Sequence, residues 1–100
     1  MQNIKKAIHN SNKIALTLTN GKVLTVHPYL ILKGRNNNNG VVLRGYIEEE
    51  PNACDIRLDQ IKQTTQLSEH YAIDDACLNF SFSDYELIFP KSGDLNDPKS

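Results

Sequence analysis

The chain has no tryptophan, one methionine and only two cysteines, Cys54 and Cys77, among its 100 residues. Small secreted domains held by disulfides usually have four or more cysteines, so this pair does not indicate a disulfide framework. The sequence also lacks a CxxC motif, so a zinc knuckle is not indicated. We expect both thiols to be reduced and buried as small hydrophobic side chains.

Long apolar runs are also missing. No stretch approaches the roughly 18 consecutive apolar residues that a membrane span needs. The first residues, from Met1 to Lys6, are not followed by the apolar segment of a signal peptide. We therefore expect a cytoplasmic protein with no membrane partner. With 39% hydrophobic and 23% charged residues, the composition is that of an ordinary globular domain.

Acidic residues are absent from the first 47 positions, which carry seven basic residues and a formal charge of +7. The remaining 53 positions carry all 12 acids against four basic residues, a formal charge of −8. Such an asymmetry indicates an anion site or a charged partner. In one small domain it is equally explained if the acidic half folds against the basic half.

The first third of the chain predicts a helix followed by a hairpin. Residues 2–10 carry Ile4, Ala7 and Ile8 on one side of a short helix. Residues 13–19 alternate with the period of a half-buried strand, and a second strand follows from 22 to about 33. The Asn20-Gly21 pair between them is typical of a type I′ hairpin turn, which needs two positive φ angles.

The second strand contains Pro28, which predicts a bulge, a bend or an edge because proline cannot donate to the ladder. Further strands are expected over residues 41–48, about 53–58 and 61–67, and the last two are separated by a tight corner or one 3-10 turn. Five strands, of which the second is long and bent, favour a mainly β (α+β) fold, a small five-stranded SH3-like or Sm-like barrel.

The C-terminal third has weaker patterns. Residues 68–78 are moderately helical, and the segment Phe80–Phe89 is an apolar arm. Residues 91–100 are polar and expected to be disordered. We therefore divide the chain into a barrel domain (1–70), a C-terminal helix and arm that pack on the barrel or a partner (71–90), and a tail (91–100).

Residues 2–70 resemble the WYL domain, the Sm-like barrel module of bacterial transcription regulators. The helix Ile4–Ile8 and the strand Gly40–Tyr46 match in order, and the corner Ile56-Arg57-Leu58-Asp59-Gln60-Ile61 is the most specific match. Val41 and Val42 stand where the family name has Trp and Tyr, and Gln60 replaces a second arginine of that corner. The chain is too short to include the DNA-binding winged helix that the regulators also carry.

The resemblance implies a ligand-sensing barrel whose basic and aromatic residues bind a nucleotide or single-stranded nucleic acid. In this sequence Arg44 and Tyr46 share one face of the strand 41–48, which places a cation beside an aromatic ring. Arg57 joins them if its strand presents the same face, with Lys33 and Arg35 as peripheral charges. In the alternative interpretation, Arg44 pairs with an acid such as Glu48 or Asp55 on a solvated face.

The residues do not indicate catalysis, a metal or a cofactor. The three histidines, His9, His27 and His70, are far apart in the sequence, so nothing forces them to converge on a metal. Cys54 and Asp55 are adjacent, and neighbours on a strand point to opposite faces, so they do not form a nucleophile with its base.

We therefore expect a non-enzymatic regulatory module that binds an anionic ligand. The alternative is a protein-interaction module without a small ligand. In that case the 80–89 arm either forms a homodimer by adding a strand to a neighbouring sheet or covers an edge of its own barrel.

Overall fold

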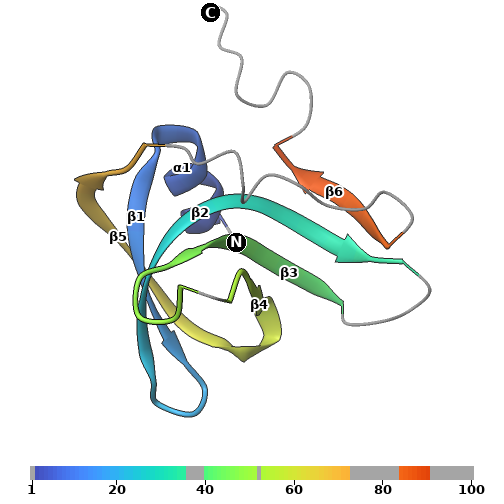
Figure 1. Ribbon diagram of the computed structural model, residues 1–100, viewed down its shortest axis with the longest axis horizontal. Coiled ribbons are helices and arrows are strands. Elements are labelled where there is room, and N and C mark those ends of the chain that lie inside the picture. Colours follow the sequence, from blue (N-terminus) through green and yellow to red (C-terminus); the bar gives the residue numbers. More distant parts are fainter. Residues whose placement is uncertain (1, 36–39, 52, 73–83, 91–100) are drawn as a thin grey trace, which may run out of the picture.

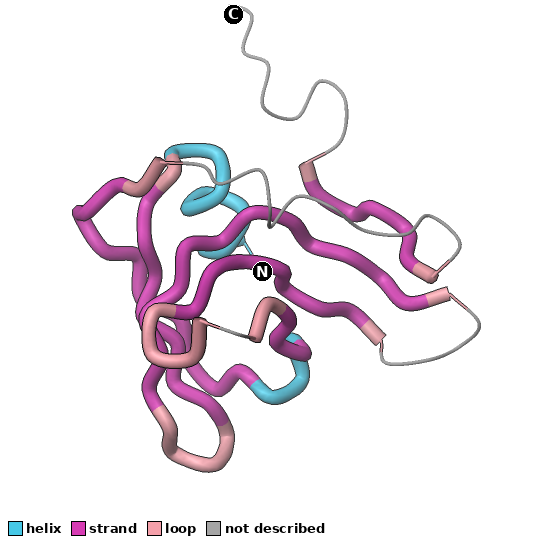
Figure 2. The backbone as a smooth tube through the Cα atoms, viewed as in Figure 1, coloured by secondary structure: helices cyan, strands magenta, loops and turns pink. Residues whose placement is uncertain are grey.

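The computed structural model describes residues 2–35, 40–51, 53–72 and 84–90. These residues form one helix, six strands and one 3-10 turn (Figure 1 and Figure 2). The elements in chain order are α1 (Gln2–Asn10), β1 (Asn12–Leu18), β2 (Val23–Gly34), β3 (Val41–Ile47), β4 (Asp55–Arg57), η1 (Leu58–Gln60), β5 (Ile61–His70) and β6 (Tyr85–Phe89). The prediction of a mainly β protein with a short N-terminal helix is confirmed.

All six strands belong to one antiparallel sheet, in which β4, β3, β2, β1 and β5 are neighbours in that order and β6 pairs with β2. β4 and β5 are the two ends of this path, and the strands of the described ranges show no pairing between these ends. The sheet is therefore open, and the expected five-stranded barrel is not shown. The predicted strand 53–58 is shortened to β4, and the 3-10 turn expected after it is η1.

Strand β2 changes its neighbour halfway along its length (Figure 1). Residues 23–26 pair with β1, and residues 31–34 pair with β6. β3 pairs with β2 across both halves, with a register shift between Pro28 and Leu30. The bulge that Pro28 predicted is confirmed, because a residue without an N–H is placed where the ladder is interrupted.

The turn between β1 and β2 contains the expected Asn20-Gly21 pair but is not a type I′ turn. The Gly21 N–H donates to the Leu18 carbonyl at 2.9 Å, and the Leu18 N–H donates to the Lys22 carbonyl at 2.8 Å. Gly21 has a φ of 90°, whereas Asn20 does not have a positive φ. This is a three-residue loop that ends in a left-handed glycine. Such a loop needs a positive φ at one residue instead of two, and that residue is Gly21.

Helix α1 packs on one face of the sheet through the predicted residues Ile4, Ala7 and Ile8, which are all buried. They belong to the larger hydrophobic core. Its other buried members are Ile14, Leu16, Leu24, Val26, Ile31, Leu43, Ile47, Ile56 and Phe89. A helix of nine residues is marginal in isolation, so this docking supplies most of its stability.

The opposite face of the sheet carries a second, smaller hydrophobic cluster. Leu32 on β2 and Val42 on β3 are register partners in it, whereas Ile31 and Leu43, one residue along, lie in the larger core. We call this smaller cluster the tyrosine cluster. It comprises the buried residues Tyr29, Leu30, Leu32 and Val42, with Tyr46, Tyr71, Tyr85 and Leu87 packed against them. The face that carries Val42, Arg44 and Tyr46 is therefore partly covered.

The described end of the apolar arm covers its own sheet. Strand β6 pairs with β2 of the same chain, which is the self-covering form of the two alternatives for the 80–89 segment. The helix expected over 68–78 is wrong for residues 68–70, because they extend β5. Cys54 is exposed rather than buried, since it lies in the link before the short strand β4. Residues 73–83, with Cys77, and the tail 91–100 lie outside the described residues.

Gly45 on β3 lies against the backbone of β2 beside the bulge. A Cβ atom on Gly45 would be 2.3 Å from the His27 carbonyl oxygen and 3.1 Å from the Pro28 Cα. Both are backbone atoms, so they cannot move aside without shifting β2. We predict that Gly45→Ala lowers the free energy of unfolding by about 1–3 kcal/mol, measured by urea unfolding.

The matched control for this prediction is Gly40→Asn. Gly40 has a φ of 59°, which asparagine tolerates, and nothing lies within 4 Å of its added Cβ. We expect this variant to unfold close to the native midpoint. A Gly45→Ala variant as stable as the control would contradict the close approach of the two strands.

Candidate functional site

The structure places three of the predicted site residues on the face of the tyrosine cluster. Arg44 and Tyr46 are two positions apart on β3, so their side chains point to the same side. Arg57 on β4 is the register partner of Val42, which belongs to the tyrosine cluster. Cross-strand partners share a face, so Arg57 joins Arg44 and Tyr46.

The two peripheral cations of the predicted site are placed differently. Lys33 is the register partner of Val41, which packs against the larger core, so Lys33 points to the opposite face. Arg35 follows β2 and donates from Nε to the Tyr85 carbonyl at 3.2 Å, beside β6. Lys33 is therefore separated from the rest of the predicted site, and Arg35 lies at its β6 side.

All four tyrosines of the chain meet in the tyrosine cluster, although they are spread from position 29 to position 85. His27 lies between two of them, Tyr46 and Tyr71. Its ring stacks on Tyr71 with centroids 5.1 Å apart, and its ring is also 5.1 Å from that of Tyr46. Tyr29 meets the ring of Tyr71 edge-on at 5.4 Å. From the sequence we identified Tyr46 alone. Tyr29 joins the cluster at the bulge of β2, Tyr71 follows the end of β5, and Tyr85 lies on β6.

Arg44 is held by the acid opposite it on β4. Its Nε donates to Asp55 Oδ1 at 2.7 Å, and its Nη2 donates to Asp55 Oδ2 at 2.9 Å. The guanidinium carbon also lies 5.5 Å from the centroid of the Tyr85 ring. The hydrogen bond to Asp55 raises the pKa of Arg44 further above its ordinary value. The structure therefore shows the expected pairing of Arg44 with Asp55, on a face that is partly covered rather than solvated.

Arg57 makes a looser pair than Arg44. Its Nη2 donates to Asp59 Oδ2 at 2.7 Å, and the two side chains are 47% and 63% exposed. The Arg44 side chain is only 14% exposed. Exposed ion pairs contribute about 0.2–1 kcal/mol, so a competing anion can displace Asp59 from Arg57 much more easily than Asp55 from Arg44.

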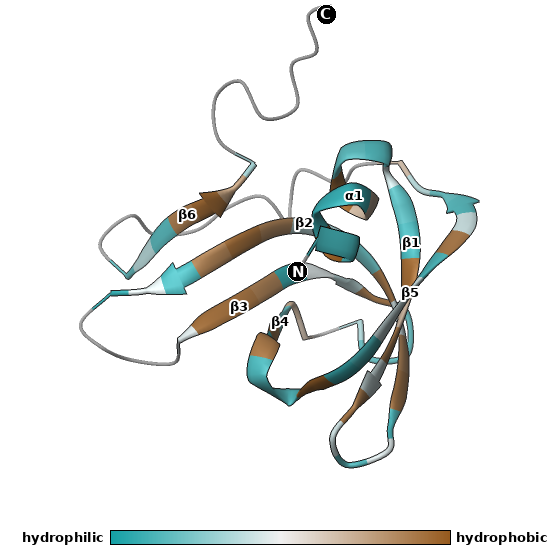
Figure 3. Cartoon of the chain, turned by 180° about the vertical axis from the view of Figure 1, so that it is seen from behind, coloured by the Kyte–Doolittle hydropathy of each residue, from teal (hydrophilic) through white to brown (hydrophobic). Residues whose placement is uncertain are grey.

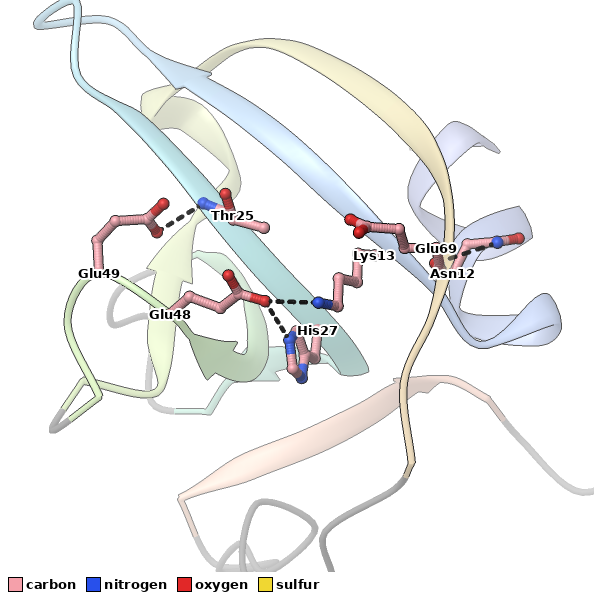
Figure 4. A network of polar contacts seen from close by, with 7 residues as sticks. All are labelled: Asn12, Lys13, Thr25, His27, Glu48, Glu49 and Glu69. Atoms are coloured by element: carbon pink, nitrogen blue, oxygen red, sulfur yellow. Dashed lines mark hydrogen bonds and ion pairs between the residues drawn. The ribbon is translucent and has the colours of Figure 1, made fainter.

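Glu48, which follows β3, joins the side chains of Lys13 on β1 and His27 on β2 (Figure 4). Its Oε2 lies 2.8 Å from His27 Nε2 and accepts from Lys13 Nζ at 2.9 Å. The hydrogen bond to His27, followed by the one to Lys13, holds the pKa of Glu48 below its usual range. The hydrogen bond between Lys13 and Glu48 also raises the pKa of Lys13. The network is next to the aromatic rings because His27 belongs to both.

Tyr71 closes the gap in the ladder of β2. Its hydroxyl donates to the Pro28 carbonyl, in the stretch of β2 between the residues that pair with β1 and those that pair with β6. Its own N–H donates to the Ser11 carbonyl at 3.1 Å, which fixes the chain as it leaves β5. Burial raises the pKa of the Tyr71 phenol above its ordinary value.

No family model, no curated protein and no solved structure matches this chain. Among the residues that the structure describes, no helix has the length and apolar content to cross a membrane. The same residues contain no group of three or more His, Cys, Asp or Glu side chains placed to hold a metal ion.

The Glu48 network makes the stability of the protein depend on pH. Because the folded pKa of Glu48 lies below its ordinary value of 4.5, its contribution is present above that value and is lost as the pH falls through the folded pKa. We predict that Glu48→Gln lowers the free energy of unfolding by about 0.2–1 kcal/mol at pH 6, and that this difference shrinks as the pH is lowered from 6 through 4.5 and below.

The measurement is urea unfolding of both proteins over this pH range. Glu86→Gln is the control, because the Glu86 side chain makes no ion pair within the described ranges. A Glu48→Gln difference that stays constant with pH would contradict the charge-dependent role of Glu48.

The hydrogen bond of Tyr71 generates a second stability prediction. Tyr71→Phe keeps the ring that stacks on His27 but leaves the Pro28 carbonyl without its donor. We expect a loss of about 0.5–1.5 kcal/mol in the free energy of unfolding. Tyr85→Phe is the matched control, since the Tyr85 hydroxyl has no hydrogen-bond partner within the described residues. Equal losses in the two variants would show that the Tyr71 hydroxyl does not support β2.

Proposed function

We propose that this chain is a non-enzymatic regulatory or sensor module that binds an anionic ligand, a nucleotide or single-stranded nucleic acid, on the face of the tyrosine cluster. The observation that carries the proposal is the common direction of Arg44, Tyr46 and Arg57 on two paired strands. Proteins that bind single strands combine cations for the phosphates with aromatic rings on which bases stack.

We also infer that the sheet is an open, divergent form of the Sm-like barrel of WYL domains. Three features support this inference. The first five strands are hydrogen-bonded neighbours in the order β4, β3, β2, β1 and β5. The pairing of the long strand β2 with β3 shifts register after Pro28. The turn η1 lies at the corner that resembles the family most. The family ligand then gives the class of ligand proposed for this chain.

The three residues have different roles in the proposed site. Arg57 contacts a phosphate, because its pair with Asp59 is exposed and readily displaced. Tyr46 offers its partly exposed ring to a base. Arg44 supports the site as a fixed positive charge beside Tyr85, since Asp55 fixes two of its N–H donors and so its orientation.

The proposal is tested by fluorescence anisotropy of labelled single-stranded DNA and RNA 20-mers at about 50 and 200 mM salt. We predict that Arg57→Ala and Tyr46→Ala each weaken binding by roughly 5- to 100-fold, in line with about 1–3 kcal/mol per stacked base. Arg57→Ala also lowers the salt slope by about 0.7, the value for one lost contact to a single strand.

Lys33→Ala is the matched control because it removes one cation from the opposite face of the same region. It should change the affinity less than the other two variants. If all three variants bind alike, or if neither the oligonucleotides nor labelled ATP bind at 50 mM salt, the proposed site is wrong.

The alternative function is a protein-interaction module that uses a strand edge. Within the described residues β6 pairs with β2 alone, so its second edge has no strand partner. An extended peptide or a second copy of the chain can add a strand to such an edge. Light scattering across a concentration series tests the second copy: a dimer that Ile88→Pro dissociates would favour this alternative over the anionic ligand.

A further inference from the structure

Within the described residues, acids pair with several basic side chains of the sheet and its turns but with none of helix α1. Ion pairs involve four acids, Glu48, Glu50, Asp55 and Asp59. Their basic partners are Lys13, Lys22, His27, Arg44 and Arg57. Helix α1 contains no acidic residue, and its Lys5, Lys6 and His9 take part in none of these pairs. Among the described residues, the positive charge of α1 therefore has no acidic partner.

These helix side chains surround a hollow on the larger-core side of the sheet. Its volume is about 460 Å³, and Lys5, Lys6 and His9 line it together with Phe89 at the end of β6. Lys5 Nζ lies 5.5 Å from the centroid of the Phe89 ring, and that ring is only 9% exposed. The cation–π contact with a core residue thus holds the Lys5 ammonium at the hollow. Figure 3 shows α1 mostly hydrophilic in front of the sheet.

A second hollow continues the basic surface on the other side of the helix. It has a volume of about 250 Å³ and lies between α1, η1 and β5. Asn3 lines both hollows, and Lys62 on β5 lines the second. Lys62 is exposed and takes part in none of the ion pairs of the described ranges. We call the surface formed by Asn3, Lys5, Lys6, His9 and Lys62 the helix surface.

The chemistry of the helix surface favours a ligand with several phosphates. Its positive groups are spread over two hollows, and the ring of Phe89 is buried beneath Lys5, so no exposed aromatic face is offered to a base. Ile4, Ala7 and Ile8 are buried in the core, so α1 has no apolar face left to insert into a lipid surface. The only exposed large hydrophobic residue of the described part is Val23, which belongs to β2 and lines neither hollow.

We propose that the helix surface binds the phosphodiester backbone of nucleic acid, without reading its bases. Lys5 and Lys6 contact phosphates, His9 and Asn3 donate hydrogen bonds, and Lys62 extends the contact toward β5. This site lies on the face opposite the tyrosine cluster and does not depend on the function proposed for that cluster. Affinity that comes from backbone phosphates depends strongly on salt.

The test compares two double variants that lose the same charge. Lys5→Gln/Lys6→Gln keeps two of the four methylene groups of each lysine and removes two charges from the helix surface. Lys22→Gln/Lys33→Gln removes two charges from residues that line neither hollow. With a labelled 20-mer of thymidine, we expect the first variant to bind at least about five-fold more weakly at 50 mM salt and to lose about 1.4 from the salt slope, two contacts of 0.7 each. The second should change the affinity less than two-fold.

Three further measurements decide the interpretation. Inorganic tripolyphosphate should shift the amide resonances of residues 5–9 in the native protein, and Tyr46→Ala should leave these shifts unchanged. Thermal unfolding checks that the helix variant remains folded. Equal weakening by the two double variants, or no shift at residues 5–9, would overturn the proposal. Binding to vesicles with 30% anionic lipid but not to the oligonucleotide would assign the surface to membranes and also overturn it.

Discussion

The interruption of β2 at Pro28 determines how the rest of the molecule is arranged. One edge of this strand pairs with β3 along most of its length, and the other edge is divided between β1 and β6. The two neighbours leave a gap between residues 26 and 31, and Pro28 lies in it without an N–H to satisfy. The remaining carbonyl accepts the hydroxyl of Tyr71, and Gly45 of β3 lets its own backbone approach that of His27.

The same interruption explains why both faces of the sheet are covered. Neighbouring residues of a regular strand point to opposite faces, yet Tyr29 and Leu30 both belong to the tyrosine cluster. A bulge places one extra residue on one strand and so breaks the alternation. The first half of β2 then contributes to the core under α1, and the second half contributes to both clusters. The tyrosine cluster is thus a consequence of the bulge.

Local patterns predicted what short-range physics decides. The stripe Ile4, Ala7 and Ile8, the hairpin and the bulge at Pro28 follow from helical spacing, turn chemistry and the missing N–H of proline. Period-two alternation also put Arg44 and Tyr46 together on one face. It could not place Lys33 on the opposite face, because that depends on the register of β2 after the bulge. Nor could it bring Tyr71 and Tyr85 to Tyr29, since those contacts depend on long-range pairing.

The charge pattern of the sequence supported two interpretations, an anion site and a fold in which the acidic half packs against the basic half. In the structure, the second applies to several cations of the sheet, and the first remains open for helix α1. Strands bring acids beside the cations of the sheet, as at Arg44 and Asp55, because a register fixes which residues face each other. Within the part of the chain that the structure describes, the exposed side of α1 has no acidic partner, since a helix that docks through three residues leaves its outer side to the solvent. Like charges on one short helix repel one another and so destabilise it. An anion that neutralises α1 removes this repulsion, so binding there and the stability of the folded helix are coupled.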